Sequence, residues 1–477
     1  MSFILMMNRI YSCYVFLGCL CLFSTGVKAQ KKVLSLKRAV EVATQNYGLI
    51  KAKNAVLKSS GEQLKQSVNE YLPDLTIGAQ QVYGTANGIS GPLGNTNGLS
   101  VGSSGPNLTS QNWNAAFGSL YVANINWEFF AFGRSKARIK VAEASLSRDS
   151  TDLAQEVFQH QVRVAGAYLN LVAAEKLRII QQNNLKRAQA IQTVVVARAK
   201  NGLNAGVDSS LANAEVSNAR IALTRSIDRE QEQANELCRL MGVISADFIP
   251  DTAIISHAPS FGIRSDTSVV NQHPLLQYYR NRIVMSDRQT AYYKSFSYPS
   301  FSLFGIFQER GSGFKLNGQQ LNTVQTAPDY TNSYWEGIKP LRGNYLVGVN
   351  LLWNLTNPFR VKHLVASQKF LSEALQNEYE LVDNRLRNEA KLIDTRIENS
   401  LSIYNEAPVQ VKAANEAFIQ KNVLYKNGLG NIVDVTQALF ALSRAETDRD
   451  IATVNLWQAL LLKAANAGNF GIFINEF

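Results

Sequence analysis

The chain of 477 residues is 46% hydrophobic and 18% charged, which provides enough apolar material for a sizeable core and excludes wholesale disorder. Its mean hydropathy is −0.11, and no run of 18 or more apolar residues follows the N-terminus, which excludes a polytopic helical membrane protein. Taken alone, the net charge of +11 would suggest nucleic acid or an anionic surface as a partner. The basic residues are spread along the chain among acids, so we expect no nucleic acid partner.

The first 29 residues have the pattern of a secretory signal peptide. Arg9 precedes an apolar stretch, residues 10–23, that is too short to span a bilayer, and a small-residue cleavage site ends at Ala29. Lipidation at Cys19 is the alternative reading of this segment. Cleavage would leave a net charge of +9 and one cysteine, Cys238, which we expect to be a small buried hydrophobe.

One unit is used twice along the chain, at a fixed offset of 226 residues. Solenoid repeats are about 20–50 residues long, so this period predicts a duplicated domain with pseudo-two-fold character. The register does not shift between the matches. These are Leu49 with Leu275, Pro73 with Pro299, Trp127 with Trp353, Arg134 with Arg360, Lys136 with Lys362, Asn201-Gly202-Leu203 with Asn427-Gly428-Leu429, Val207-Asp208 with Val433-Asp434, and Ala212 with Ala438.

Both copies have the same predicted order of elements: a helix, a β-hairpin, a very long helix, a glycine turn and a further helix. Pro73 and Pro299 end the first helix of each copy and mark the start of its first strand. The predicted bounds in the first repeat (30–241) are helix 48–70, hairpin 74–130, helix 134–201 and helix 208–241; in the second repeat (274–466) they are helix 274–296, hairpin 299–356, helix 360–427 and helix 434–466. Residues 242–273 form a linker between the copies, and residues 467–477 form a C-terminal tail.

The predicted strands alternate with period two, as half-buried strands do. On one face lie Phe117, Tyr121, Ala123, Ile125, Trp127 and Phe129 of the first copy, and Tyr345, Val347, Val349, Leu351 and Trp353 of the second. On the other face lie Asn124, Asn126 and Glu128, and Asn344, Gly348, Asn350 and Asn354. A soluble sandwich would explain the alternation, but the strand lengths and the terminal aromatic residues fit a membrane β-barrel.

The first hairpin is uncharged, since residues 75–127 contain no Asp, Glu, Lys or Arg, which suits a hairpin flanked by lipid. Four strands do not close a membrane barrel, because an open edge in lipid leaves backbone groups unpaired. Single-chain bacterial barrels begin at about eight strands. If these strands span a membrane, several copies of the chain must therefore share one barrel.

The long helices need partners, because residues 134–201 would extend about 100 Å at 1.5 Å per residue. Coiled-coil spacing is visible in both copies. The seam residues are Leu153, Val157, His160, Val164, Ala167, Leu171 and Ala174 in the first copy, and Leu375, Tyr379, Val382, Leu386, Ala390, Ile393 and Ile397 in the second. The two shorter helices of each copy are expected to stack end to end beside the long one. Pro408 predicts a local kink or break in the second long helix.

These patterns resemble the TolC-like outer-membrane efflux proteins over nearly the whole chain. The resemblance is carried by Tyr71-Leu72-Pro73 and Tyr298-Pro299, by Trp127-Glu128-Phe129 through Gly133-Arg134 and Trp353-Asn354-Leu355 through Phe359-Arg360, and by Tyr425-Lys426-Asn427-Gly428 with Ile432-Val433-Asp434-Val435. It implies a mostly α fold with a membrane β-barrel portion: a homotrimer with a 12-stranded barrel in the outer membrane and a long α-helical coiled-coil barrel across the periplasm. The linker and the chain ends would form an equatorial collar.

The resemblance also implies a function without catalysis or cofactors. The protein would be the exit duct of a tripartite efflux or type I secretion system, with a periplasmic adaptor and an inner-membrane pump as partners. The tips of the helical hairpins would close the periplasmic aperture there. Their residues include Asp434, Asp208, Tyr425, Gln437, Gly202 and Gly428.

Asp434 is the tip residue for which two roles are expected. In one role, Asp434 of three copies would form a carboxylate ring that attracts cations. In the alternative role, Asp434 would be a helix N-cap, with Gln437 three residues further along the chain. Asp208 holds the same position in the first copy. Tyr425 is expected to latch the tip or to pack within it. The family often has a second aspartate and an arginine where this chain has Gln437 and Gly430.

Asn124, Glu128, Asn350 and Asn354 are predicted to face the barrel lumen, and Trp127 and Trp353 the membrane interface. No enzyme motif is present, and the four histidines (His160, His257, His273 and His363) lack paired metal spacing. His160, at a seam position, is expected to be a packed core histidine. The alternative function is a periplasmic coiled-coil structural or adaptor protein without a membrane span, which would not need the uncharged hairpin.

Overall fold

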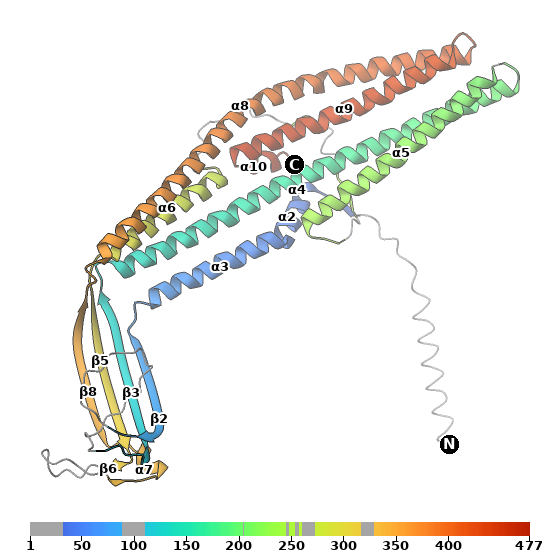
Figure 1. Cartoon of the computed structure of the whole chain (residues 1–477). Coiled ribbons are helices and arrows are strands. Elements are labelled where there is room, and N and C mark those ends of the chain that lie inside the picture. The colour runs from blue at the N-terminus through green and yellow to red at the C-terminus, as the bar shows by residue number, and fades with distance from the viewer. Residues whose placement is uncertain are drawn as a thin grey trace, which may run out of the picture. The chain divides into compact units, whose positions relative to one another are not determined.

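The chain folds into two compact units joined by continuous helices in the computed structural model (Figure 1). The structure describes residues 32–87, 110–203, 205–244, 248–252, 257–259, 272–315 and 329–477. The expected signal peptide with Cys19 and most of the linker 242–273 lie outside these ranges. The sheet unit comprises Ala55–Thr151 and Tyr278–Glu380, and the helical unit comprises Met1–Asn54, Asp152–Gln277 and Leu381–Phe477. Each unit takes matching parts of both repeats.

The sheet unit contains one antiparallel sheet of four strands in the order β2-β3-β5-β8. Its strands are β2 (Asp74–Thr85), β3 (Ala115–Phe130), β5 (Ser300–Ser312) and β8 (Arg342–Leu352). The helices that leave and enter the sheet are α3 (Gly48–Asn69), α4 (Arg134–Lys200), α6 (Pro274–Ser295) and α8 (Asn357–Lys426). The central pair β3–β5 joins one repeat to the other, so β2 and β8 are left as open edges.

A short crossing segment lies on the apolar face of the sheet, at the end away from the helices. It contains α7 (Tyr334–Ile338), and the small ribbon β6 (Phe314–Lys315) with β7 (Asp329–Tyr330) precedes it. The hydroxyls of Ser119 and Tyr121 donate to the carbonyl of Ile338 at 2.9 and 3.1 Å. A Cβ at Gly337 would lie 2.4 Å from Cβ of Phe117, so only glycine permits this close approach.

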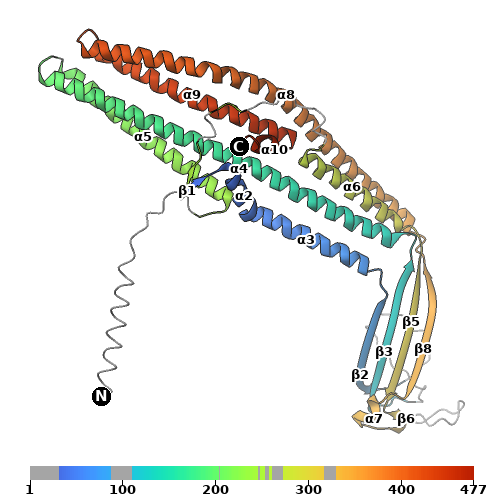
Figure 2. The same ribbon diagram turned by 180° about the vertical axis from the view of Figure 1, so that it is seen from behind.

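The helical unit is built from two antiparallel helical hairpins, visible in Figure 2. α4 pairs with α5 (Gly206–Met241), and α8 pairs with α9 (Ile432–Ala467). A bidentate ion pair joins the hairpins, since Arg187 of α4 donates to both carboxylate oxygens of Glu446 on α9 at 3.1 and 2.7 Å. Both side chains are half-buried, which limits solvent screening of the pair.

The main core lies in the helical unit at mid-length of α4, where the first described residues of the chain meet its C-terminal residues. Strand β1 (Lys32–Leu34) pairs in parallel with β4 (Phe248–Pro250), and α2 (Leu36–Asn46) and α10 (Gly471–Ile474) pack beside them. Tyr168, Trp457 and Phe473 are fully buried here. The Tyr168 hydroxyl donates to the carbonyl of Leu34 at 2.7 Å and accepts from the Asp251 amide at 2.9 Å. That this core belongs to an equatorial collar stays a prediction.

Two helix junctions repeat at the offset of 226 residues. Gly242 ends α5 and Gly468 ends α9, both with left-handed φ of 66° and 70°. A Cβ at Gly242 would lie 3.2 Å from Cβ of Asn46, and one at Gly468 would lie 2.8 Å from Cα of His273. The end of each hairpin helix therefore abuts the residues that precede α3 or α6. This is the end-to-end stacking that the helix lengths suggest.

The helices begin and end within three residues of the bounds expected from the sequence. Of the kink or break predicted at Pro408, the break is wrong, because α8 continues through this residue as one helix, and the kink stays a prediction. In the predicted seams, His160, Val164, Ala167, Leu171, Val382, Leu386 and Ile393 are buried, together with Ala174. Within the described ranges, none of the helices combines the length and apolar composition of a bilayer-spanning segment.

Candidate functional site

The hairpin tips end in the same glycine motif in both copies. Gly202 and Gly428 have φ of 73° and 78°, which side chains with a Cβ rarely adopt. The amide of Leu203 donates to the carbonyl of Arg198 at 2.9 Å, and the amide of Leu429 donates to that of Leu424 at 2.9 Å. These six-to-one bonds satisfy the last helical carbonyls, so the glycines terminate α4 and α8.

The N-cap of α9 is Asn431 and not Asp434, so the capping role expected for Asp434 is wrong. The Asn431 side chain accepts from the Val433 amide at 3.0 Å. Asp434 is the third residue of α9, and Asp208 is the third residue of α5. An acid there stabilises the helix through its dipole by about 0.3–1 kcal/mol. Gln437 lies one turn further and is exposed.

Asp434 has a partner within its own hairpin, because Lys421 of α8 donates to it at 2.9 Å. Both side chains remain nearly half exposed. The carboxylate is thus accessible to solvent while a lysine neutralises it. Within one copy, the Asp434 carboxylate is therefore part of an ion pair.

Arg198 connects the two tips, although no sequence pattern marks it. Its guanidinium donates to the carbonyl of Lys426 at 2.7 Å and to that of Tyr425 at 3.4 Å, and it lies 5.6 Å from the Tyr425 ring centroid. Arg198 matches Leu424 in the second repeat, so duplication gave no signal. A basic residue in the last turn of a helix was the available hint.

Tyr425 is 3% exposed and belongs to a small core with Val195, Ala212, Ile432 and Val435. This cluster takes residues from all four hairpin helices. Of the two roles expected for Tyr425, the structure shows packing, with the ring held beneath the Arg198 guanidinium.

The polar face of the sheet brings together three of the four residues predicted to line the lumen. Glu128 pairs with Ser302 and Ser302 with Asn350, so all three share one face, and Asn124 lies on that face two rows away. Asn354 follows the end of β8, where its side-chain oxygen accepts from the Thr356 amide at 3.0 Å. The prediction that Asn354 is a strand residue is wrong.

A polar cavity of about 420 Å³ opens beside Glu128 and Asn350 at the helix end of this face. Arg134 lies 3.3 Å from the Glu128 carboxylate, and Arg138 lies 2.5 Å from that of Glu70. The Arg134 guanidinium also stacks 5.1 Å from the Phe296 ring centroid. Four of the charges in this cavity therefore form two ion pairs, whereas Asp74, which also lines it, has no ion-pair partner among the described residues.

The two predicted interface tryptophans make the same hydrogen bond in both copies. The Trp127 indole N–H donates to the carbonyl of Tyr71 at 2.9 Å, and that of Trp353 donates to the carbonyl of Ser297 at 3.3 Å. Trp353 follows the last residue of β8. Pro73 and Pro299 stand immediately before β2 and β5, as expected for the residues where the strands start.

Burial lowers the pKa of two histidines in the helical unit. His160 is fully buried, stacks on Tyr47 at 3.8 Å between ring centroids and bonds to the carbonyl of Leu240 at 3.0 Å. Burial, followed by the nearby Arg163, lowers the His160 pKa. His273 bonds to the carbonyl of Ala465 at 3.1 Å, and burial lowers its pKa as well. The core role expected for His160 is confirmed.

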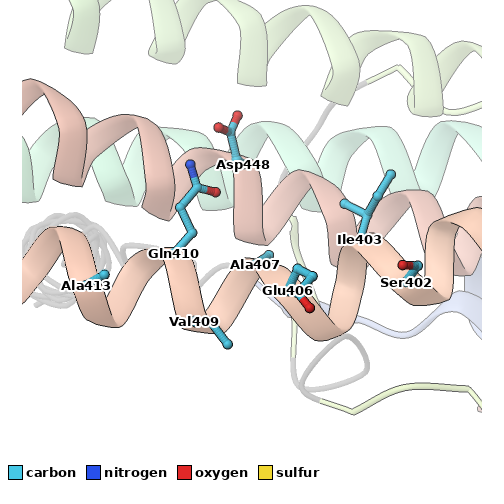
Figure 3. Close-up of a pocket in the computed structure, with 8 residues that line it drawn as sticks. All are labelled: Ser402, Ile403, Glu406, Ala407, Val409, Gln410, Ala413 and Asp448. Atoms are coloured by element: carbon cyan, nitrogen blue, oxygen red, sulfur yellow. The ribbon is translucent and has the colours of Figure 1, made fainter.

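A second cavity, of about 440 Å³, lies between α8 and α9 near Pro408 (Figure 3). Proline has no amide hydrogen, so α8 lacks the helical bond to the carbonyl of residue 404. Gln410 points toward Asp448 of α9, whereas Val409 points away from it. The described residues contain no group of three His, Cys, Asp or Glu suited to a metal ion.

Several solved outer-membrane channels have the same fold. VceC from Vibrio cholerae is 17% identical, with a TM-score of 0.70 over 91% of this chain and 96% of that one. CmeC from Campylobacter jejuni is 12% identical, with a TM-score of 0.72 over 91% and 85%. MtrE from Neisseria gonorrhoeae, in its open state, is 15% identical, with a TM-score of 0.69 over 93% and 94%. No curated protein sequence matches the chain.

The fold is thus the one seen in these outer-membrane channels. In the sequence itself, residues 39–243 match the family described as outer membrane efflux protein. The resemblance predicted from the duplicated pattern is thus confirmed at two levels, because the family model matches residues 39–243 and the fold matches that of the channels over 91% of the chain.

Proposed function

We propose that the protein is the outer-membrane exit duct of a tripartite efflux or type I secretion system. It would lie in the outer membrane and extend into the periplasm. In this function it is a passive, non-catalytic conduit for substrates that an inner-membrane pump delivers. The family match and the shared channel fold support the proposal.

The observation that carries the proposal is the four-stranded sheet with two open edges. The free backbone groups of β2 and β8 require partners if the sheet lies in lipid. Three copies joined β8 to β2 would give a closed barrel of 12 strands. Leu75, Ile77, Tyr345, Val347 and Val349 are 63–82% exposed in one copy, and they would face lipid on the outside of such a barrel.

The helices also leave apolar surface for neighbouring copies. α8 exposes a row of apolar side chains that recur every 11 residues, and α9 exposes a second row with the same spacing. The rows are Phe370, Leu381, Leu392 and Ile403 on α8, and Phe440, Ile451 and Leu462 on α9. Eleven residues are close to three whole turns, so each row follows one helix face, as in a right-handed supercoil. A trimer would bury both rows in the helical barrel.

The hairpin tips are proposed to form the periplasmic aperture and the docking site for an adaptor and the pump. Asp434 would line the narrowest point beside Lys421, with which it pairs at 2.9 Å. The Asp434→Ala variant should then show higher single-channel conductance and weaker block by multivalent cations. Lys421→Gln frees the carboxylate and should strengthen that block. Equal block in both variants and the wild type would remove Asp434 from the aperture.

The function itself is tested by membrane fractionation and gel mobility. The duct should co-purify with outer membranes and migrate as a heat-modifiable trimer. A soluble periplasmic monomer would contradict the proposal and favour the structural or adaptor role. Crosslinkers placed at Gly202 and Gly428, the residues that end α4 and α8, would identify the inner-membrane partner.

A further inference from the structure

Two arginines lie directly opposite each other on the polar face of the sheet, at the end away from the helices. Arg310 of β5 and Arg342 of β8 are paired in the strand register. Paired residues point to the same side with their Cβ atoms about 5 Å apart. The register also places both on the face that carries Asn124, Glu128 and Asn350. Both are exposed.

Like charges directly opposite one another destabilise an antiparallel pair. Among the described residues, neither the Arg310 nor the Arg342 guanidinium has a hydrogen-bond or ion-pair partner. The adjacent acid, Glu309, pairs with Gly343 and Tyr121 and so lies on the opposite face. Glu336 of the crossing segment lies 3.9 Å from Lys315. The positive charge of the pair is therefore uncompensated within one copy.

A neighbouring copy would not neutralise the pair either. The open edge of β8 would meet β2 of the next copy, and residues 75–127 of that copy contain no charged residue. The segment 316–328 is also uncharged. The nearest acid on the polar face of β2 is Asp74, at the helix end of the strand. The pair would thus stay cationic in the assembled barrel.

The other residues in the cross-strand row that contains the two arginines are uncharged. Gln80 pairs with Leu120, Leu120 with Arg310, and Arg310 with Arg342. The next row toward the helices ends in Gln308 and Asn344, whose amides are hydrogen-bond donors. Two guanidinium forks beside amide donors can each bind two oxygens of a carboxylate, sulfate or phosphate group.

We propose that Arg310 and Arg342 form a binding site for oxyanions at the outward end of the duct. Three copies would give a ring of guanidinium groups, two from each copy. The ring would favour anionic solutes over cationic ones as they leave. This inference rests on the proposed function, because it assigns the polar face to the lumen of a trimeric barrel. The ligand is a solute and not a lipid, because the site lies opposite the apolar face.

The test is the ion selectivity of the reconstituted full-length protein in zwitterionic phosphatidylcholine bilayers. Reversal potentials under a KCl gradient give the chloride-to-potassium permeability ratio, and inorganic pyrophosphate added at the loop side probes block. The Arg310→Gln/Arg342→Gln variant should lower the ratio severalfold and abolish the block. Arg310→Lys/Arg342→Lys should keep the ratio and weaken the block, since an ammonium lacks the fork.

The matched control is Lys315→Gln/Lys339→Gln, which removes the same charge from the crossing segment and its ribbon. The control should leave the ratio and the block as in the wild type. If both glutamine pairs lower the ratio equally, bulk charge explains it and the site is overturned. If Arg310→Gln/Arg342→Gln forms open channels with unchanged selectivity, the oxyanion site is also contradicted, but the proposed function is not. A wild type that forms no channel overturns the proposed function itself. If the double variant Arg310→Gln/Arg342→Gln fails to insert into the bilayer, the single variant Arg342→Gln, on the edge strand, is tested in its place.

Discussion

The junction at Gly468 gives the sharpest prediction about stability. Gly468→Ala adds a Cβ to a residue with φ of 70°, which costs about 1–2 kcal/mol. The new carbon would also lie 2.8 Å from Cα of His273 and 2.9 Å from Cδ of Pro274. Backbone and proline ring atoms have little freedom to move, and overpacking of this kind costs about 1–3 kcal/mol. The total is about 2–5 kcal/mol.

Gly202→Ala is the matched control, because its φ is 73° and no atom lies within 4 Å of the added Cβ. It should cost only the left-handed conformation, about 1–2 kcal/mol. Hydrogen exchange at the start of α6 measures the difference, where the Gln277 amide donates to the carbonyl of His273 at 3.0 Å. Exchange there should accelerate in Gly468→Ala and stay as in the wild type in Gly202→Ala. Equal exchange in both variants would refute the close contact as the cause.

Three further predictions concern the helical unit. Burial lowers the pKa of His160 and His273 below the unfolded value of 6.5, so the unfolded chain binds more protons than the folded one. The stability should therefore be complete above pH 6.5 and should fall as the pH drops through and below that value. Thermal melts of His160→Gln/His273→Gln should not show this pH dependence, and a pH dependence that remains would have to come from other groups. Arg198→Gln removes a charged donor to the Lys426 carbonyl, a hydrogen bond worth about 1.5–3 kcal/mol, and should increase spontaneous channel openings. Lys200→Gln, in the same last turn of α4, should not, and equal effects of the two variants would exclude a bond between the tips. A double-mutant cycle of Arg187→Gln and Glu446→Gln should give a coupling of about 1 kcal/mol in chemical unfolding, and additive effects would show that the half-buried pair contributes nothing.

The helices and strands were predictable because local patterns determine them. Pro73 and Pro299 mark strand starts, and Gly202 and Gly428 mark helix ends, since backbone geometry restricts those positions to few residue types. Alternation placed Asn124, Glu128 and Asn350 on one face before any pairing was known. The duplication strengthened each of these inferences by repeating it.

The remainder depends on contacts between distant segments. The Arg198 bond to Lys426 joins residues 228 apart, and no periodicity reports such a pair. The crossing segment with α7 lies on the sheet through Ser119 and Tyr121, which are ordinary strand residues in the sequence. Asp434 was placed at a helix N-cap because it follows the glycine turn, but Asn431 is closer and its side chain reaches the Val433 amide. The local sequence determines that a helix forms after the glycine turn, and competition between nearby polar side chains determines the residue at which the helix begins.

Disulfide crosslinking between strand edges tests the shared barrel most directly. Within one copy β2 and β8 are separated by two strands, so they lie about 14 Å apart, too far for a disulfide. Thr76→Cys would be paired with cysteines at Asn344, Leu346 or Gly348 of β8, with the buried Cys238 replaced by alanine. Oxidation in outer membranes should give covalent dimers and trimers, and nothing larger, at one of these registers. Absence of crosslinking at every register, or a ladder beyond the trimer, would contradict the account.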